Sequence, residues 1–246
     1  MKMRRPKMIL FDYGHTLANE PCFDGLKGNQ ALMPYVTRNP RHVTAEEIQA
    51  FADRLFCDSC IAKARELGVE IHNSMLDRLT YETLGLEFSL PQPELERVFV
   101  DAAVPCAPMP GAQALLDFLK ASGIRSGVVS NISFGERTLK GRIDRLLPRN
   151  DFEFIIASSE YGVRKPDPLI FELALRKADL PAEDVWFCGD NTICDIYGAA
   201  AVGIFPVWFH SPLPCDYRDT SLDVRPDCGH LYIRDWPELI EALKTL

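Results

Sequence analysis

Short apolar runs alternate with helical patterns through most of the chain, and this alternation is the strongest constraint on the fold. The runs are bounded by glycine or polar residues, as expected of buried strands. Five of them occur, at residues 8–11, 124–130, 152–157, 185–188 and 204–209. Helical patterns lie at residues 111–122, 136–147, 169–178 and 236–246. Strands that alternate with helices of this length predict an α/β fold with a parallel sheet.

The region between the first two predicted strands follows a different pattern, because no run there is convincing as a strand. Thr44 and Glu47 form a capping box ahead of an apolar helical stripe. Further helical patterns lie at residues 74–84 and 93–103. We therefore expect a helical insertion after the first strand. The predicted domains are a core of residues 1–19 and 108–246 and a helical cap of residues 20–107.

Polar side chains follow the predicted strands at the points where the strands end. They are Asp12 and Thr16, Ser130 and Asn131, Lys165, Asp190 and Asp195. The carboxyl ends of parallel strands meet at one edge of a sheet, where ligands bind. A single Asp at a strand end is more typical of a helix cap. Groups of this kind at four strand ends instead predict one site with three carboxylates and one lysine.

The order and spacing of these residues resemble the haloacid dehalogenase-like (HAD) superfamily. Its motifs are D-x-D-x-T after the first strand, a Ser or Thr closing an apolar strand, a Lys before a helix, and G-D-x-x-x-x-D before a Gly-Ala-rich helix. In this chain they correspond to residues 12–16, Ser130, Lys165-Pro166 and residues 189–195. The resemblance covers residues 7–20 and 108 to about 210. The cap matches only as a helical insertion at the expected place.

The resemblance implies a Rossmann-like parallel-sheet core and a phosphatase that hydrolyses a small phosphorylated metabolite, such as a sugar or nucleotide phosphate. It implies that Asp12 is the nucleophile and forms an aspartyl-phosphate that water then hydrolyses. The implied cofactor is Mg²⁺, which prefers hard oxygen ligands. The implied metal ligands are Asp12, the main-chain carbonyl of Gly14, Asp190, and Asp195 directly or through a metal-bound water. The implied phosphate-binding groups are Ser130, the Asn131 backbone and Lys165, and the implied catalytic residues are Asp12, Ser130 and Lys165.

The chain departs from the family pattern at Gly14, where most HAD phosphatases carry a second Asp as general acid/base. Loss of such help typically slows a reaction ~10²–10⁴-fold. Three interpretations stay open: a substrate with a good leaving group, another group such as His15 in its place, or a HAD-like protein with weakened catalysis that binds metal and phosphate and acts through a partner. The simpler interpretations are that His15 is a solvent-facing turn residue and that Gly14 permits a turn with positive φ.

Two other HAD reactions are alternatives. Dehalogenases carry an aromatic residue at the position of Gly14 and lack the Gly-Asp motif, whereas here Tyr13 is one residue early and Asp190 is present. Phosphonate hydrolases need a cap lysine, for which Lys27 and Lys63 are the candidates. No positive signal in the sequence points to either reaction.

Composition limits the partners and the location. The formal net charge is −8, and no Lys/Arg cluster lies past the N-terminus, which disfavours nucleic-acid binding. No apolar run approaches the ~20 residues of a membrane span, and the basic start has no signal-peptide core, so we expect a cytoplasmic protein without a membrane partner. The stretch 211–229 is rich in Pro, Asp and Cys and is expected to be a surface loop. The oligomeric state is left open.

The eight cysteines are scattered and are expected to be free thiols. Cys57 and Cys60 form a C-x-x-C pair inside a helical pattern, but no second pair completes a zinc site. Cationic side chains of the cap that could contact an anionic substrate are Arg54, Lys63, Arg65 and Arg78. Solvated faces of the cap helices are the more usual explanation of such residues.

Overall fold

The computed structural model describes residues 3–58, 60–211, 213–216 and 224–246. Its centre is a six-stranded parallel sheet with the strand order β10-β9-β8-β1-β6-β7. The strands are β1 (Met8–Phe11), β6 (Arg125–Ser130), β7 (Ile155–Ala157), β8 (Val185–Gly189), β9 (Phe205–Phe209) and β10 (Leu231–Ile233). The predicted parallel α/β sheet is confirmed, and β1 lies inside it between β6 and β8.

Two strands differ from the prediction. The run at residues 152–157 is a strand only from Ile155 onward. The sixth strand, β10, was not predicted, because it has three residues and its middle residue, Tyr232, is 42% exposed. Such a strand is recognised by its pairing with β9 and not by a local apolar run.

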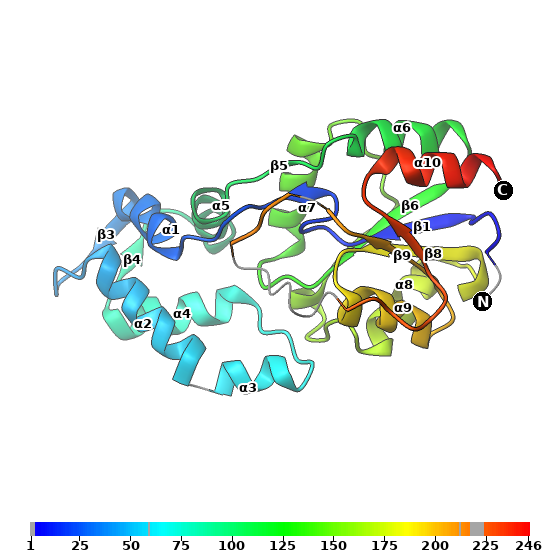
Figure 1. The fold of residues 1–246 in the computed structure, drawn as a ribbon. Helices are drawn as coiled ribbons and strands as arrows, with labels where there is room; N and C mark the ends of the chain where they lie inside the picture. Colours follow the sequence, from blue (N-terminus) through cyan, green and yellow to red (C-terminus); the bar gives the residue numbers. More distant parts are fainter. Residues whose placement is uncertain (1–2, 59, 212, 217–223) are drawn as a thin grey trace.

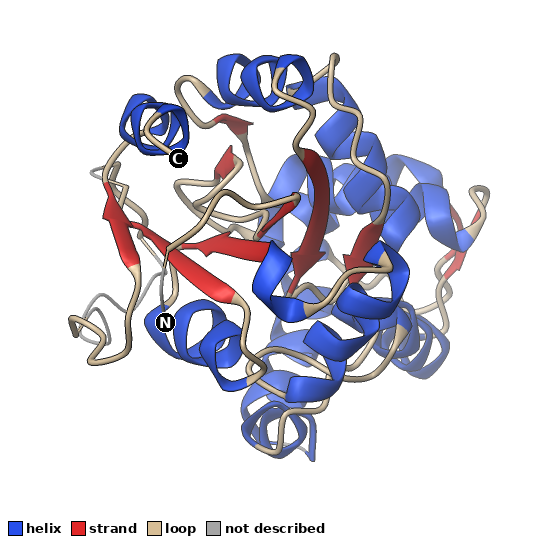
Figure 2. Ribbon diagram, turned by 90° about the vertical axis from the view of Figure 1, so that its right-hand side faces the viewer, coloured by secondary structure: helices blue, strands red, loops and turns tan. Residues whose placement is uncertain are grey.

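Helices cover both faces of the sheet (Figures 1 and 2). One face carries α6 (Ala112–Ala121), α7 (Glu136–Leu146) and α10 (Trp236–Lys244), and the other carries α8 (Pro168–Ala178) and α9 (Gly198–Ala201). Successive side chains of a strand point to opposite faces. Ile9 and Phe11 of β1 therefore pack on the first face, and Met8 and Leu10 pack on the second. Burial on both faces explains why β1 is a continuous apolar run.

The insertion lies between β2 (Ala18–Asn19) and β5 (Ala107–Pro108), to one side of the sheet (Figure 1). Its helices are α1 (Gly25–Leu32), α2 (Ala45–Asp58), α3 (Cys60–Glu66), α4 (Asn73–Leu84) and α5 (Gln92–Ala103). They bury a hydrophobic cluster of their own, separate from the two clusters of the sheet faces. The expectation that this region has no strands is wrong, because β3 (Val36–Arg38) and β4 (Glu87–Phe88) pair antiparallel. Strands of two or three residues are too short to leave a periodic pattern.

The start of α2 confirms the predicted capping box. The Glu47 amide donates to Thr44 Oγ1 at 3.3 Å, and the Thr44 amide donates to Glu47 Oε2 at 2.9 Å. Helix α1 was not predicted, because it contains two glycines, which disfavour a helix. A Cβ on Gly28 would lie 2.5 Å from the Phe99 ring of α5. Close packing of α1 on α5 therefore requires a glycine that local propensity counts against the helix.

The two segments that connect the sheet to the insertion lie side by side, since β2 pairs antiparallel with β5. Arg142 of α7 is 1% exposed and holds both segments. Its guanidinium donates to the Glu20 carboxylate at 3.2 Å and to the main-chain carbonyls of Val100 and Val104 at 3.3 and 2.8 Å. The division into a core of residues 1–19 and 108–246 and a cap of residues 20–107 stays a prediction.

Three further expectations concern the surface and the thiols. No helix within the described ranges is both long and apolar enough to cross a bilayer. The described free cysteines are Cys22, Cys106, Cys188, Cys194, Cys215 and Cys228, and the side chains of Cys57 and Cys60 lie outside the described residues. The predicted loop 211–229 is described except for residues 212 and 217–223, and its described part forms neither helix nor strand.

Candidate active site

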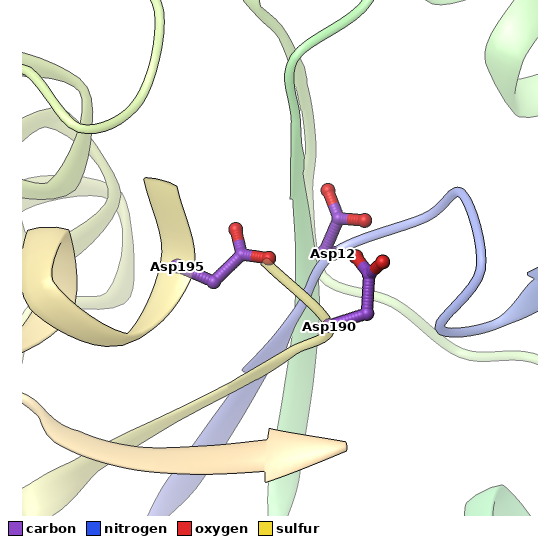
Figure 3. A group of neighbouring side chains, drawn as sticks. All are labelled: Asp12, Asp190 and Asp195. Atoms are coloured by element: carbon purple, nitrogen blue, oxygen red, sulfur yellow. The ribbon is translucent and has the colours of Figure 1, made fainter. Parts of the chain in front are cut away.

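Three aspartates meet at the carboxyl ends of two neighbouring strands. Asp12 follows β1 and Asp190 follows β8, and the parallel pairing of these strands places both residues at the same edge of the sheet. Asp195 comes from the π-helical turn η4 (Thr192–Tyr197). One carboxylate oxygen of each aspartate lies within 4.8 Å of the others, and all three residues are buried. Figure 3 shows the three carboxylates gathered at the ends of these elements.

The local sequence after β8 explains how Asp195 reaches the site. A Cβ on Gly189 would lie 2.6 Å from the Cβ of Asp195, so only glycine leaves room for the aspartate. The Asn191 side chain caps the turn by accepting from the Cys194 amide at 2.8 Å. The Asp195 carboxylate in turn accepts from the Asn191 amide at 2.9 Å. The spacing of the Gly-Asp motif thus matches the length of a tight turn, and this turn places the last aspartate of the motif, Asp195, beside the end of β8.

The Lys165 ammonium lies between two of the carboxylates. Its Nζ is 2.6 Å from an oxygen of Asp12 and 2.6 Å from an oxygen of Asp195. Burial lowers the pKa of Lys165, but the two carboxylates outweigh burial, so its pKa lies above the ordinary value and the side chain stays charged. Burial raises the pKa of Asp12 to about 6, although Lys165 opposes the shift. Two carboxylates share one ammonium and the third, Asp190, lies beside them, so the site carries excess negative charge that a cation would offset.

The donor atoms at this point fit a hard divalent cation. Within the described ranges, the residues grouped as metal ligands here are the three aspartates. Two thiols lie nearby, and burial raises the pKa of Cys188 well above its ordinary value and that of Cys194 to about 11. Neither thiol is grouped with the three aspartates, so the donor atoms that meet here are carboxylate oxygens. Oxygen donors without thiolate or imidazole suit Mg²⁺ better than Zn²⁺.

Asn131 has a function that the sequence did not indicate. Its side-chain amide donates to the Lys165 carbonyl at 2.8 Å, and its side-chain oxygen accepts from the Lys165 amide at 2.7 Å. Asn131 therefore clamps the backbone on both sides of the Lys165 side chain. Ser130, at the end of β6 beside β1, is 2% exposed. The predicted phosphate contacts of Ser130 and of the Asn131 backbone, and the predicted metal contact of the Gly14 carbonyl, stay predictions.

The residues after Asp12 correct one expectation. The left-handed conformation lies at His15, with φ of 55°, and Gly14 is not among the residues with positive φ, so the expected turn role of Gly14 is wrong. His15 lies in the turn after Asp12, is partly exposed, and its Nε2 lies 3.3 Å from Cys215 Sγ. A Cβ on residue 14 would lie 3.3 Å from Glu20 Oε2. The position that lacks an aspartate is thus next to another buried carboxylate, which no sequence motif marked.

Three cationic side chains of the insertion contact other residues of the insertion. The Arg54 guanidinium lies 5.6 Å from the centre of the Phe51 ring, and Arg78 pairs with Glu82 at 2.9 Å. Arg65 reaches Glu70, with 3.7 Å between Nε and the carboxylate. These contacts give Arg54, Arg65 and Arg78 structural partners, and a contact with substrate stays a prediction for them and for Lys63.

Comparisons with known proteins agree on one family of hydrolases. A family model described as haloacid dehalogenase-like hydrolase matches residues 6–203. The chain is similar to a glyceraldehyde 3-phosphate phosphatase of Pyrococcus furiosus, with 32% identity over 55% of this chain and 54% of that protein. It is also similar to a pyrimidine 5'-nucleotidase of Escherichia coli, with 28% identity over 82% of this chain and 85% of that protein. The chain spans about half the length of the first curated relatives it matches.

Solved structures give the same fold over the whole chain. A 2-haloacid dehalogenase from Pseudomonas syringae pv. Tomato DC3000 superimposes with a TM-score of 0.61, covering 98% of this chain and 99% of that one. The two sequences are 23% identical, so this similarity concerns the fold alone.

Proposed function

Because the chain belongs to the haloacid dehalogenase-like hydrolase family, we propose that it is a magnesium-dependent phosphatase that acts on a small phosphorylated metabolite through an aspartyl-phosphate intermediate. The observation that carries the proposal is the Asp12 carboxylate, held 2.6 Å from the Lys165 ammonium and grouped with Asp190 and Asp195. A phosphate ester is negatively charged, so an anionic nucleophile can approach it only where other groups offset this charge. The lysine and a cation on the aspartates would supply that charge.

The reaction has two steps. A carboxylate oxygen of Asp12 attacks phosphorus, the bond from phosphorus to the ester oxygen breaks, and the leaving oxygen takes up a proton from solvent. Water then attacks phosphorus of the aspartyl-phosphate and gives up a proton to solvent, so that Asp12 leaves as a carboxylate and inorganic phosphate is released. Lys165 places its charge against Asp12 and the transferring group, and Ser130 and the Asn131 backbone would donate hydrogen bonds to phosphoryl oxygens.

The aspartates would hold Mg²⁺ together with the Gly14 carbonyl, and the bound ion would offset the charge of the phosphate. Asp12 and Asp190 are the direct carboxylate ligands of this proposal. Both oxygens of Asp195 already have partners, the Lys165 ammonium and the Asn191 amide. This pairing favours a contact of Asp195 through a metal-bound water.

The relatives support the substrate class. Two of them are named for the hydrolysis of a triose phosphate and of pyrimidine nucleotides, both small phosphorylated molecules. A dehalogenase activity is less well supported, because Asp190 is present and lies in the carboxylate group beside Asp12. The structural similarity to dehalogenases does not argue for that activity, since it concerns the fold.

Gly14 favours a second candidate function, a HAD-like protein with weakened catalysis that acts as a metal- and phosphate-binding or regulatory module. No side chain at residue 14 can move a proton to or from the reacting oxygens. The buried Glu20 carboxylate lies beside this position, and its other oxygen pairs with Arg142. The two candidates differ in rate, and only turnover separates them.

The test is a panel of phosphomonoesters, with triose phosphates and nucleoside monophosphates included, measured with Mg²⁺ and with a chelator. Asp12→Asn keeps the size of the side chain and removes the nucleophile, and Glu183→Gln, whose side chain is 67% exposed, is the matched control. We expect turnover by the wild type and the control that needs Mg²⁺ and is lost in Asp12→Asn. Equal turnover by the wild type and Asp12→Asn would refute the proposal. Binding of Mg²⁺ and phosphate with no turnover on any substrate would favour the second candidate.

A further inference from the structure

The connection between α3 and α4 of the insertion lies against the loop that precedes Lys165. Val69 and Val163 form an antiparallel bridge. The Arg164 amide donates to the Gly68 carbonyl at 3.2 Å, and the Glu70 amide donates to the Gly162 carbonyl at 3.1 Å. The insertion thus adds a short strand-like segment to the loop that carries the lysine.

Glu70, the last residue of this segment, sends its carboxylate into the core. Its side chain is 1% exposed. The carboxylate accepts from Ser158 Oγ at 3.0 Å and pairs with Arg164 at 3.3 Å, and Arg65 of α3 lies 3.7 Å away. Burial of a carboxylate is costly unless cations and hydrogen-bond donors surround it. Two of the three partners belong to the core, so the position of Glu70 is tied to the sheet as much as to the insertion.

Both core partners of Glu70 lead to Lys165. Arg164 is the adjacent residue. Ser158 Oγ accepts from the Ile132 amide at 2.9 Å, next to Asn131, whose amide clamps the Lys165 backbone on both sides. The Glu70 carboxylate therefore joins the two loops that fix the lysine, one through Arg164 and the other through Ser158.

We propose that Glu70 is a positioning residue: its buried carboxylate holds the loop of Lys165 so that the ammonium stays within 2.6 Å of Asp12. The inference rests on the proposed function, because Lys165 matters only where Asp12 reacts. It has the consequence that the site is complete only while the α3–α4 connection is seated on the core (Figure 1). The insertion would then act on the chemical step as well as on access to the site.

Two variants and one control test the inference. Glu70→Gln can still accept from Ser158 but loses the charge that faces Arg164, and Glu70→Ala loses both contacts. Glu87→Gln is the control, because Glu87 is also an ion-paired glutamate of the insertion, with a side chain that is 64% exposed. A misplacement of about 1 Å can lower a rate ~10²-fold. We expect kcat to fall roughly 10–100-fold in Glu70→Ala and less in Glu70→Gln, with KM changed less than threefold and Glu87→Gln unchanged.

Hydrogen–deuterium exchange gives a readout that does not need activity. Faster exchange at residues 160–166 in the Glu70 variants, at an unchanged overall melting temperature, would show that the carboxylate holds the loop. Unchanged kcat in an active protein, or unchanged exchange at these residues, would overturn the inference. If the wild type has no phosphatase activity, the proposed function fails and the exchange arm alone decides whether Glu70 holds the Lys165 loop. If Glu70→Ala does not fold, Glu70→Gln carries both measurements.

Discussion

Replacement of Lys165 by methionine is expected to remove the ammonium that pairs with the buried carboxylates of Asp12 and Asp195. Methionine keeps the length of the stem and its packing near the Phe187 ring, 5.0 Å from Nζ. It removes two hydrogen bonds of 2.6 Å from a buried cation to Asp12 and Asp195. Such bonds are worth about 1.5–3 kcal/mol each, and loss of one partner of a buried ion pair costs about 3–5 kcal/mol.

The variant no longer buries the lysine charge, so the desolvation cost of that charge is removed as well. We therefore expect a net loss near the lower limit, about 3 kcal/mol of unfolding free energy. Urea unfolding at pH 8 with a chelator measures it, and Lys177→Met, at an exposed position, is the control. Added Mg²⁺ should stabilise Lys165→Met more than the wild type, because the ion then meets three carboxylates without a competing ammonium. A tenfold gain in affinity would appear as about 1.4 kcal/mol of extra stabilisation at saturating metal. Equal stability of the variant and the wild type in chelator, or no effect of Mg²⁺ on either, would refute this account of the charge balance.

Three further outcomes are expected. Burial raises the pKa of Asp77 to about 7, so this group favours folding at low pH, and its contribution to stability is lost as pH rises from about 4 to about 7. Asp77→Asn should therefore be about 2–4 kcal/mol more stable than the wild type at pH 8 and nearly equal to it at pH 4. Urea unfolding at both pH values measures the difference. Gly189→Ala should be less stable by about 2 kcal/mol or more and should lose Mg²⁺ binding in calorimetry, because its Cβ would displace Asp195; unchanged metal affinity would contradict the close approach seen here. Gly14→Asp should be destabilised by about 1–3 kcal/mol through repulsion from Glu20, and Glu20→Gln in the same chain should reduce the repulsion, which a double-mutant cycle tests.

Much of the sheet and of the carboxylate group could be predicted from the sequence because both depend on local patterns. A strand buried on both faces leaves an apolar run, as β1 does, and Asp12 and Asp190 directly follow such runs. Asp195 is fixed by a turn of a few residues, so its motif spacing contains its geometry.

Other features depend on contacts between residues far apart in the sequence, and no local pattern records them. Glu70 meets Ser158 across 88 positions, and Asn131 clamps Lys165 across 34. The sequence neighbourhood of Glu70 does not distinguish it from a solvent-exposed residue. The strand end marks Asn131 as a site residue but does not indicate its contacts with the Lys165 backbone. The left-handed residue after Asp12 is His15 and not the expected Gly14, and the Glu20 carboxylate lies beside residue 14.

The contacts of the buried Arg142 guanidinium limit which residues of the insertion can be deleted or exchanged. Its contacts within residues 20–107 are the Glu20 and Asp101 carboxylates and the Val100 and Val104 carbonyls. Tyr13 is the partner that would be left if residue 19 were joined directly to residue 108. Such a chain would carry a cation without carboxylates at the base of α7, where removal of one partner of a buried pair already costs about 3–5 kcal/mol. Exchange of the insertion between relatives should therefore keep residues 20 and 100–104 of this chain and replace only residues between 21 and 99.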